Sequence, residues 1–158
     1  MEPIIRAEKP EHKSDILTAL EKAVNDEILA AFQYWTAYHM TAGPGKYDAD
    51  PMFEEHAKQE WEHVELLTQR IKELGGKLTT DPNNIRANAT EWYPVTTGDV
   101  KHLAKLIHEA EQRAAEKYSR LAFATLDSDP GTYRIILQIL ATEQEHEYEL
   151  HKLRESLE

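Results

Sequence analysis

Two short segments of the chain pair a glutamate with a histidine three residues later. The first pair is Glu60 with His63, and the second is Glu143 with His146. Residues three apart lie on one face of an α-helix, so each pair can grip one metal ion. One such pair is a weak signal in a chain rich in both residue types. Two pairs predict a metal centre.

A further glutamate precedes each pair at a similar distance along the chain. Glu27 and Glu111 each begin the pattern Glu-x-x-Ala-Ala-x-x-Tyr, which ends at Tyr34 and Tyr118. The two halves of the chain therefore carry the same set of chemical groups. We choose Glu111 rather than Glu109 in the second half, because Glu109 shares its helix face with polar residues and Glu111 shares its face with apolar ones.

Four carboxylates and two imidazoles form the predicted ligand set. Its members are Glu27, Glu60, His63, Glu111, Glu143 and His146. The four carboxylate charges balance two divalent cations, and oxygen-rich ligation suits iron or manganese better than a closed zinc site. Buried carboxylates are unfavourable unless they are paired, protonated or bound to metal. The alternative is therefore a salt-bridged network of the same six side chains without metal.

The ligands are expected to play two different roles. Glu60 and Glu143 are the expected bridging carboxylates, because their own helices also supply the histidines. The remaining two glutamates of the set are then terminal ligands, one per metal, together with His63 and His146.

Tyr34 and Tyr118 are candidate catalytic residues beside this set. Each lies two turns beyond Glu27 or Glu111 on the same helix face. A tyrosine in that place can hydrogen-bond a ligand carboxylate or be oxidised transiently. The alternative is that both rings only fill the core.

Four amphipathic helices are predicted, because apolar residues recur at intervals of three and four. The expected ranges are 14–41, 51–74, 99–126 and 130–157, within one domain over residues 1–158. Asp50 with Pro51 predicts the start of the second helix, since Asp is a favoured N-cap and proline is favoured at the first helical position.

The connection over residues 76–98 is long and rich in turn-forming residues. It is long enough to travel along the bundle, whereas the other two connections are short. The predicted fold class is therefore all-α, a four-helix bundle of two antiparallel hairpins joined by a crossover between the second and third helices.

Composition excludes several classes of function. The chain has no cysteine, which rules out disulfide scaffolds, iron–sulfur clusters and thiol catalysis. Its formal charge of -11 attracts cations and argues against nucleic acid as a partner, and Arg6, Lys9 and Lys13 are too few to change this. Because no apolar stretch suits a membrane span or a signal peptide, we expect a cytoplasmic protein without a membrane partner.

The segment from Asn25 to Tyr34, NDEILAAFQY, and both Glu-x-x-His segments resemble the bacterioferritin and Dps-like branch of the ferritin-like family. The resemblance covers all four helices. It implies a ferroxidase site with two iron ions per subunit, or manganese, where dioxygen or hydrogen peroxide oxidises ferrous iron. It also implies storage of ferric oxide in a hollow shell.

Two other functions compete with the one that the resemblance implies. The main alternative is a di-metal oxidase, or a peroxidase or catalase-type enzyme, that stores no iron, and a substrate-sized pocket beside the site would favour it. A purely structural or DNA-shielding shell would show no fast iron chemistry.

Departures from the family pattern set further expectations. Trp61 stands where bacterioferritins carry the methionine that ligates haem, so no haem is expected. The chain ends at Glu158, without length for the fifth helix of bacterioferritins and classical ferritins, which favours a closed, Dps-like dodecamer. The cysteine pair of some Dps-like relatives is also missing.

Overall fold

The computed structural model describes residues 10–158 of the chain. Arg6 and Lys9, two of the basic residues considered above, lie outside this range. The elements are α1 (Pro10–Met40), α2 (Lys46–Glu73), α3 (Ile85–Asn88), α4 (Val100–Thr125) and α5 (Pro130–Ser156). No strand forms within the described range, where Ala42 and Asp99 make only an isolated bridge.

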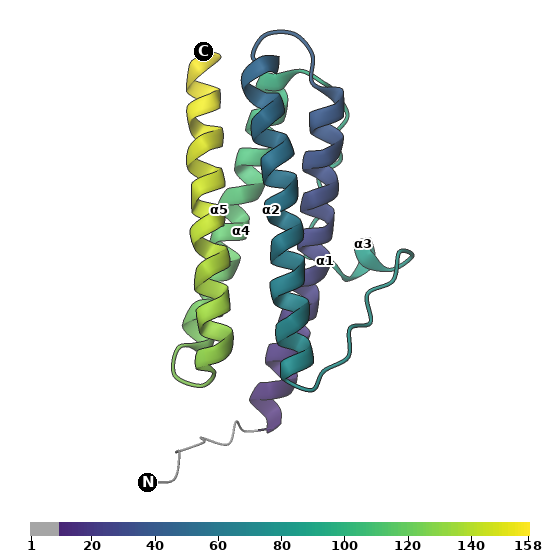
Figure 1. Ribbon diagram of the computed structural model, residues 1–158, viewed down its shortest axis with the longest axis vertical. Helices are drawn as coiled ribbons and strands as arrows, with labels where there is room; N and C mark the ends of the chain where they lie inside the picture. The colour runs from purple at the N-terminus through teal and green to yellow at the C-terminus, as the bar shows by residue number, and fades with distance from the viewer. Residues whose placement is uncertain (1–9) are drawn as a thin grey trace.

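The four long helices form an elongated bundle (Figure 1). α1 pairs with α2 and α4 pairs with α5, each pair as an antiparallel hairpin. The long connection runs from one end of the bundle to the other, so α2 and α4 point the same way (Figure 1). The predicted fold class is confirmed. Among the helices described, none has the length and apolar character needed to cross a lipid bilayer.

The second helix begins earlier than the sequence pattern predicts. α2 starts at Lys46 and contains Pro51, so the prediction of a start at Pro51 is wrong. Gly45 precedes the helix with φ of 84°, a left-handed conformation that glycine adopts without strain. Asp50 does not cap the helix, because its carboxylate pairs with Lys46 at 2.7 Å and accepts a hydrogen bond from Thr41.

The crossover is fastened along α1 by side chains of that helix. The backbone N–H of Thr79 donates to Glu21 at 2.7 Å, and that of Thr90 donates to Asp26 at 2.6 Å. Gly98 closes the segment against the end of α1, where a Cβ atom would come within 1.9 Å of a backbone carbonyl oxygen. The crossover contains the short helix α3, which the sequence pattern did not indicate. It thus lies over the face of the bundle formed by α1 and α4.

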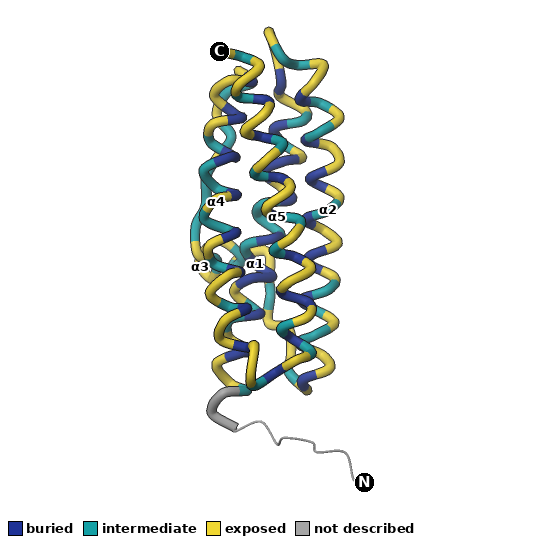
Figure 2. Tube along the Cα trace, turned by 90° about the vertical axis from the view of Figure 1, so that its left-hand side faces the viewer, coloured by how far each residue is buried: buried dark blue, intermediate teal, exposed yellow. Residues whose placement is uncertain are grey.

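Two apolar clusters fill the bundle, and buried residues line the inner face of each long helix (Figure 2). The cluster near the start of α1 includes Leu20, Leu67 and Ile136. The cluster near the opposite end includes Phe53 and Leu103. Between them lies a layer of buried polar side chains, which forms the candidate site.

Candidate metal centre

All six predicted ligands lie together in this polar layer. α1 supplies Glu27, α2 supplies Glu60 and His63, α4 supplies Glu111, and α5 supplies Glu143 and His146. None of the six is more than 4% exposed. Glu109, which was rejected as a ligand, is only half-buried and lies outside the cluster.

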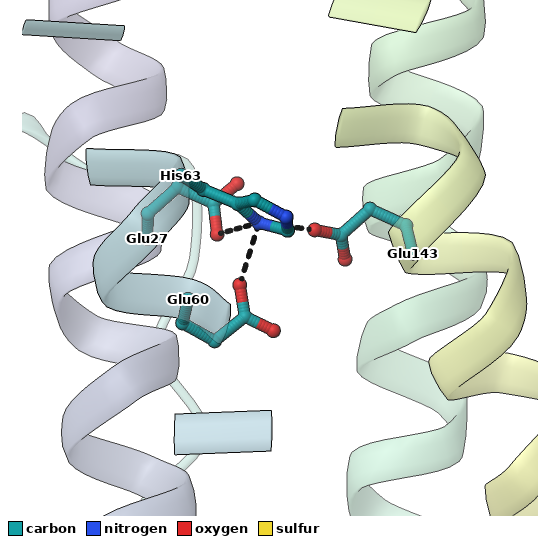
Figure 3. A group of neighbouring side chains, drawn as sticks. All are labelled: Glu27, Glu60, His63 and Glu143. Atoms are coloured by element: carbon teal, nitrogen blue, oxygen red, sulfur yellow. Dashed lines mark hydrogen bonds and ion pairs between the residues drawn. The ribbon is translucent and has the colours of Figure 1, made fainter. Parts of the chain in front are cut away.

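One group of ligand atoms surrounds His63 (Figure 3). Its Nδ1 atom lies 3.1 Å from a carboxylate oxygen of Glu60, 3.0 Å from one of Glu143 and 3.5 Å from one of Glu27. A single imidazole nitrogen cannot donate to three carboxylates at once. Converging lone pairs of this kind are typical of a cation site.

A second group surrounds His146. Its Nδ1 atom lies 3.1 Å from Glu60 Oε1 and 3.5 Å from Glu111 Oε1, and Glu143 also belongs to this group. Within each group the ligand atoms all lie within 4.8 Å of one another. Glu60 and Glu143 are the two residues shared by both groups. The structure therefore arranges the carboxylates so that two of them face both positions.

Several buried atoms of the site make no well-aligned hydrogen bond, although other polar atoms lie close to them. They are Glu60 Oε1, Glu143 Oε1 and His146 Nδ1. An unpaired buried polar atom is costly, and an unpaired buried carboxylate oxygen more so. A divalent cation in each group would coordinate these atoms. The oxygen-rich donor set of each group thus suits such an ion.

The carboxylates divide into two classes of acidity in the metal-free site. Burial, with the charge of Glu27, raises the pKa of Glu60 to about 7. Burial and the charges of Glu60 and Glu111 raise the pKa of Glu143 well above its ordinary value. Burial also opposes ionisation of Glu27 and Glu111, but their contacts with the two histidines and with the other carboxyl groups lower both pKa values, that of Glu111 to about 2. The two shared glutamates are therefore the ones that take up protons.

The two histidines shift in the opposite direction from ordinary buried imidazoles. Burial alone would lower their pKa values. The surrounding carboxylates outweigh burial, so that the pKa of His146 rises to about 10 and that of His63 rises well above its ordinary value. Without metal, protons on Glu143, on both histidines and partly on Glu60 offset the clustered negative charge.

Tyr34 and Tyr118 both donate hydrogen bonds to site carboxylates. The Tyr34 hydroxyl donates to Glu111 and the Tyr118 hydroxyl donates to Glu27. Burial and nearby carboxylate charges raise the pKa of each tyrosine well above its ordinary value, so both hydroxyls keep their hydrogen. Tyr118 belongs to one apolar cluster and Tyr34 to the other. The two rings therefore close the polar layer on opposite sides.

The sequence pattern did not identify two residues that contact His146, Gln59 and His56, as parts of the site. Gln59 Oε1 lies 2.7 Å from His146 Nε2. His56 is 1% exposed, and its ring stacks on His146 at 3.8 Å between centroids. Burial and the nearby charge of His146 lower the pKa of His56 to about 4. Their spacing from Glu60 was the available signal, but it does not show which helix they face.

A cavity of about 270 Å³ reaches the site between α1 and α4. We call it the α1/α4 cavity. Its inner wall includes Glu27, Glu111 and Glu143, and residues 90–93 of the crossover lie at its outer side. Ala30 and Ala114, which correspond in the repeated pattern, also line it.

Comparison with known proteins places the chain in a family. The protein-family model named Ferritin, which describes the ferritin-like domain, matches residues 17–158. A DNA protection during starvation protein from Pyrococcus furiosus is 29% identical over 134 residues, which are 84% of this chain and 72% of the relative. The dodecameric thioferritin of Bacteroides fragilis, a bacterioferritin-related protein, is 31% identical with a TM-score of 0.89, over 92% of this chain and 87% of that one.

A more distant structure shares the fold. Dps from Thermosynechococcus elongatus is 21% identical with a TM-score of 0.85, over 90% of this chain and 91% of that one. The family model, the bundle topology and the two relatives agree, and the chain belongs to the ferritin-like domain family.

Proposed function

We propose that this protein is a ferroxidase subunit of an iron-storing cage. Its substrate is ferrous iron, bound as a pair by Glu27 and His63 on one side and by Glu111 and His146 on the other. Iron storage and ferroxidase-type activity are general functions of the ferritin-like and Dps proteins. The family match over residues 17–158 supports the proposal.

One observation carries the proposal: Glu60 and Glu143 belong to both ligand groups. Shared carboxylates hold two metal ions close together and spread their negative charge between them. Two ferrous ions side by side supply two electrons, which reduce dioxygen to peroxide or hydrogen peroxide to water.

Storage requires a closed shell, and several features support self-association. The bacterioferritin-related relative from Bacteroides fragilis is a dodecamer, which makes twelve subunits the proposed number here. Phe32 and Trp35 are about half exposed on α1 and stack at 5.9 Å, and Trp92 of the crossover lies 6.2 Å from Phe32. An exposed aromatic patch of this kind is typical of a surface that associates.

Two properties of relatives are not proposed for this chain. DNA binding is not proposed although one relative is a DNA protection protein, because the formal charge of -11 repels phosphate. Haem binding is not proposed either, because Trp61 offers no thioether ligand at the position where bacterioferritins bind haem.

Iron loading of the purified protein tests the proposal. Metal-free protein receives ferrous iron without oxygen, and then dioxygen or hydrogen peroxide. Ferric absorbance gives the oxidation rate, and light scattering gives the particle size before and after loading. Fast oxidation with iron retained in a particle of about twelve subunits supports the proposal. A monomer or dimer that releases its ferric iron would overturn the storage function.

The α1/α4 cavity favours a second candidate, a di-metal oxidase or peroxidase that stores no iron. The cavity reaches Glu27, Glu111 and Glu143 and has room for a small organic molecule. Among the charged residues that line the cavity, Asp26 and Lys117 pair with each other at 2.9 Å. This candidate predicts many turnovers of oxidant per bound metal pair without growth of ferric mineral, so the same experiment separates the two functions.

A further inference from the structure

The ligands repeat between the two halves of the chain, but the side chains behind them do not. The residue before the shared glutamate is Gln59 in α2 and Thr142 in α5. Gln59 Oε1 accepts from His146 Nε2 across the bundle at 2.7 Å. The Thr142 hydroxyl instead donates to the backbone carbonyl of Gln138 in its own helix. Within the described part of the chain, no side chain hydrogen-bonds Nε2 of His63.

The packing of the two imidazole rings also differs, and again the additional support is at His146. His56 precedes the shared glutamate of α2 by one turn, and its ring lies nearly parallel to that of His146, with 22° between the planes. Glu149 contacts His56 Nε2 at 2.6 Å and so fixes the stacked ring in turn. The corresponding residue of α5 is Ile139, an aliphatic side chain. His146 is therefore held from behind by two side chains that have no counterpart at His63.

This asymmetry has a chemical effect on metal binding. A hydrogen-bond acceptor at Nε2 keeps the imidazole proton on that nitrogen, so Nδ1 presents a lone pair to the metal. His146 Nδ1 lies 3.1 Å from Glu60 Oε1 and 3.5 Å from Glu111 Oε1, so this nitrogen points into the metal site. His63 has no such acceptor, so only the carboxylates near its Nδ1 orient the ring, and a bound metal ion would replace those contacts. Holding a ring that has lost its other contacts reduces affinity.

We propose that the two metal positions are unequal, and that the position of Glu111 and His146 binds a divalent cation more tightly than the position of Glu27 and His63. Gln59 is the positioning residue of the tight position. The inference rests on the proposed two-metal site and adds an order of occupancy to it. The tight position fills first.

Titration of the metal-free protein with Co²⁺ tests this order without any turnover. Calorimetry measures the two affinities, and the visible absorption of Co²⁺ reports its ligand geometry. The wild-type protein should bind two ions in separate steps. Glu111→Ala should remove the tighter step and leave the weaker one, whereas Glu27→Ala should do the opposite. Loss of the tighter step in Glu27→Ala would overturn the assignment.

Substitutions at Gln59 test the positioning role. Gln59→Met keeps an unbranched side chain but removes the acceptor, so the tighter step should weaken by about 10- to 100-fold. Gln59→Glu keeps an acceptor oxygen and should restore it. Thr142→Val, at the corresponding place in α5, should change neither step. An unchanged tight step in Gln59→Met, or an equal loss in Gln59→Glu, would overturn the proposal.

The same titration separates this inference from the proposed function. If no Co²⁺ binds to the wild-type protein, the two-metal site itself is wrong. If two ions bind with equal affinity and Gln59→Met has no effect, the site stands and only the inequality is wrong.

Discussion

Tyr34 on α1 donates its hydroxyl hydrogen to the carboxylate of Glu111 on α4, which belongs to the other hairpin. In the same way, the Tyr118 hydroxyl on α4 donates to the carboxylate of Glu27 on α1. The repeated pattern places each tyrosine two turns beyond a glutamate of its own helix, yet each bond reaches the glutamate of the opposite helix. The carboxylates of Glu27 and Glu111 are therefore each oriented by the tyrosine of the other hairpin.

Tyr34→Phe should keep the fold but destabilise it. The substitution leaves the buried Glu111 carboxylate without its donor, and a hydrogen bond to a charged group contributes about 1.5–3 kcal/mol. Urea unfolding of the metal-free protein measures the loss. Tyr47→Phe is the matched control, because Tyr47 is 90% exposed and its loss of a hydroxyl should matter little. Equal stability of the two variants would contradict the structural role of the bond.

The same variant decides between two roles for Tyr34 in oxidation. If the hydroxyl only orients Glu111, the rate of ferrous oxidation should fall by about tenfold, the lower end of the effect of losing a ligand's hydrogen-bond partner. A rate that falls by several powers of ten, with two Co²⁺ ions still bound, would instead show that the tyrosine itself is oxidised. Stopped-flow absorbance and Co²⁺ titration give both quantities.

Replacing Glu60 and Glu143 together with alanine should abolish rapid ferrous oxidation. Both metal positions lose a shared ligand, and the site loses half of its carboxylates. The fold should survive, because the deletion relieves repulsion among buried carboxylates in the metal-free protein. Oxidation rate, helical circular dichroism and particle size are the measurements.

Glu109→Ala is the control for this double variant. Glu109 is a half-buried glutamate of α4 outside the cluster, so its loss should leave all three quantities unchanged. A double variant that oxidises iron at the wild-type rate, at equal iron per subunit, would show that another site is reactive.

The parts of the site that follow helical period could be predicted from the sequence. Glu111 rather than Glu109 points into the bundle because of its phase among apolar neighbours, and this needs no knowledge of the other helices. Gln59 could not be found in this way, because its hydrogen bond to His146 joins α2 to α5. The sequence does not show how far these two helices are shifted along the bundle axis relative to each other. The predicted helix start at Pro51 was wrong for a similar reason. Asp50 accepts a hydrogen bond from Thr41, in the loop before the helix, instead of capping the helix.

The metal-free fold should lose stability as pH rises from about 6 to about 9. Glu60, Glu143, His63 and His146 all have pKa values raised in the folded state. A group with a raised pKa stabilises the fold fully below its unfolded pKa, and this contribution is lost as pH rises through the folded value. The lowered pKa values of Glu27 and Glu111 act in the acid range, and the lowered pKa of His56 opposes the trend only below its ordinary value of 6.5, so the fall continues above that pH.

Thermal unfolding in the presence of a chelator measures this trend. The midpoint temperature of unfolding should decrease as pH rises from about 6 to about 9, most clearly around pH 7, where Glu60 loses its proton. Bound Co²⁺ should reverse the slope, because metal binding displaces the same protons and strengthens as pH rises. The double variant Glu60→Gln with Glu143→Gln removes two of the titrating groups and should show a shallower slope. A steeper slope in that variant would contradict the assignment.

Filling the α1/α4 cavity should slow ferrous oxidation without removing the metal site. Ala30 and Ala114 line the cavity one turn beyond Glu27 and Glu111, so larger side chains there narrow the path to those carboxylates. Ala30→Leu combined with Ala114→Leu should therefore reduce the oxidation rate several-fold. The number of Co²⁺ ions bound at equilibrium should stay the same, because the ligands are intact and only the approach is obstructed.

Ala124→Leu provides the control, since Ala124 is an exposed alanine of α4 away from the cavity lining. It should oxidise iron at the wild-type rate. Overpacking distorts a core when no space is available, so unfolding midpoints of all three proteins show whether the cavity accepts the added atoms. If the double leucine variant folds, binds two Co²⁺ ions and oxidises iron as fast as the control, then iron and oxidant reach the site by another path.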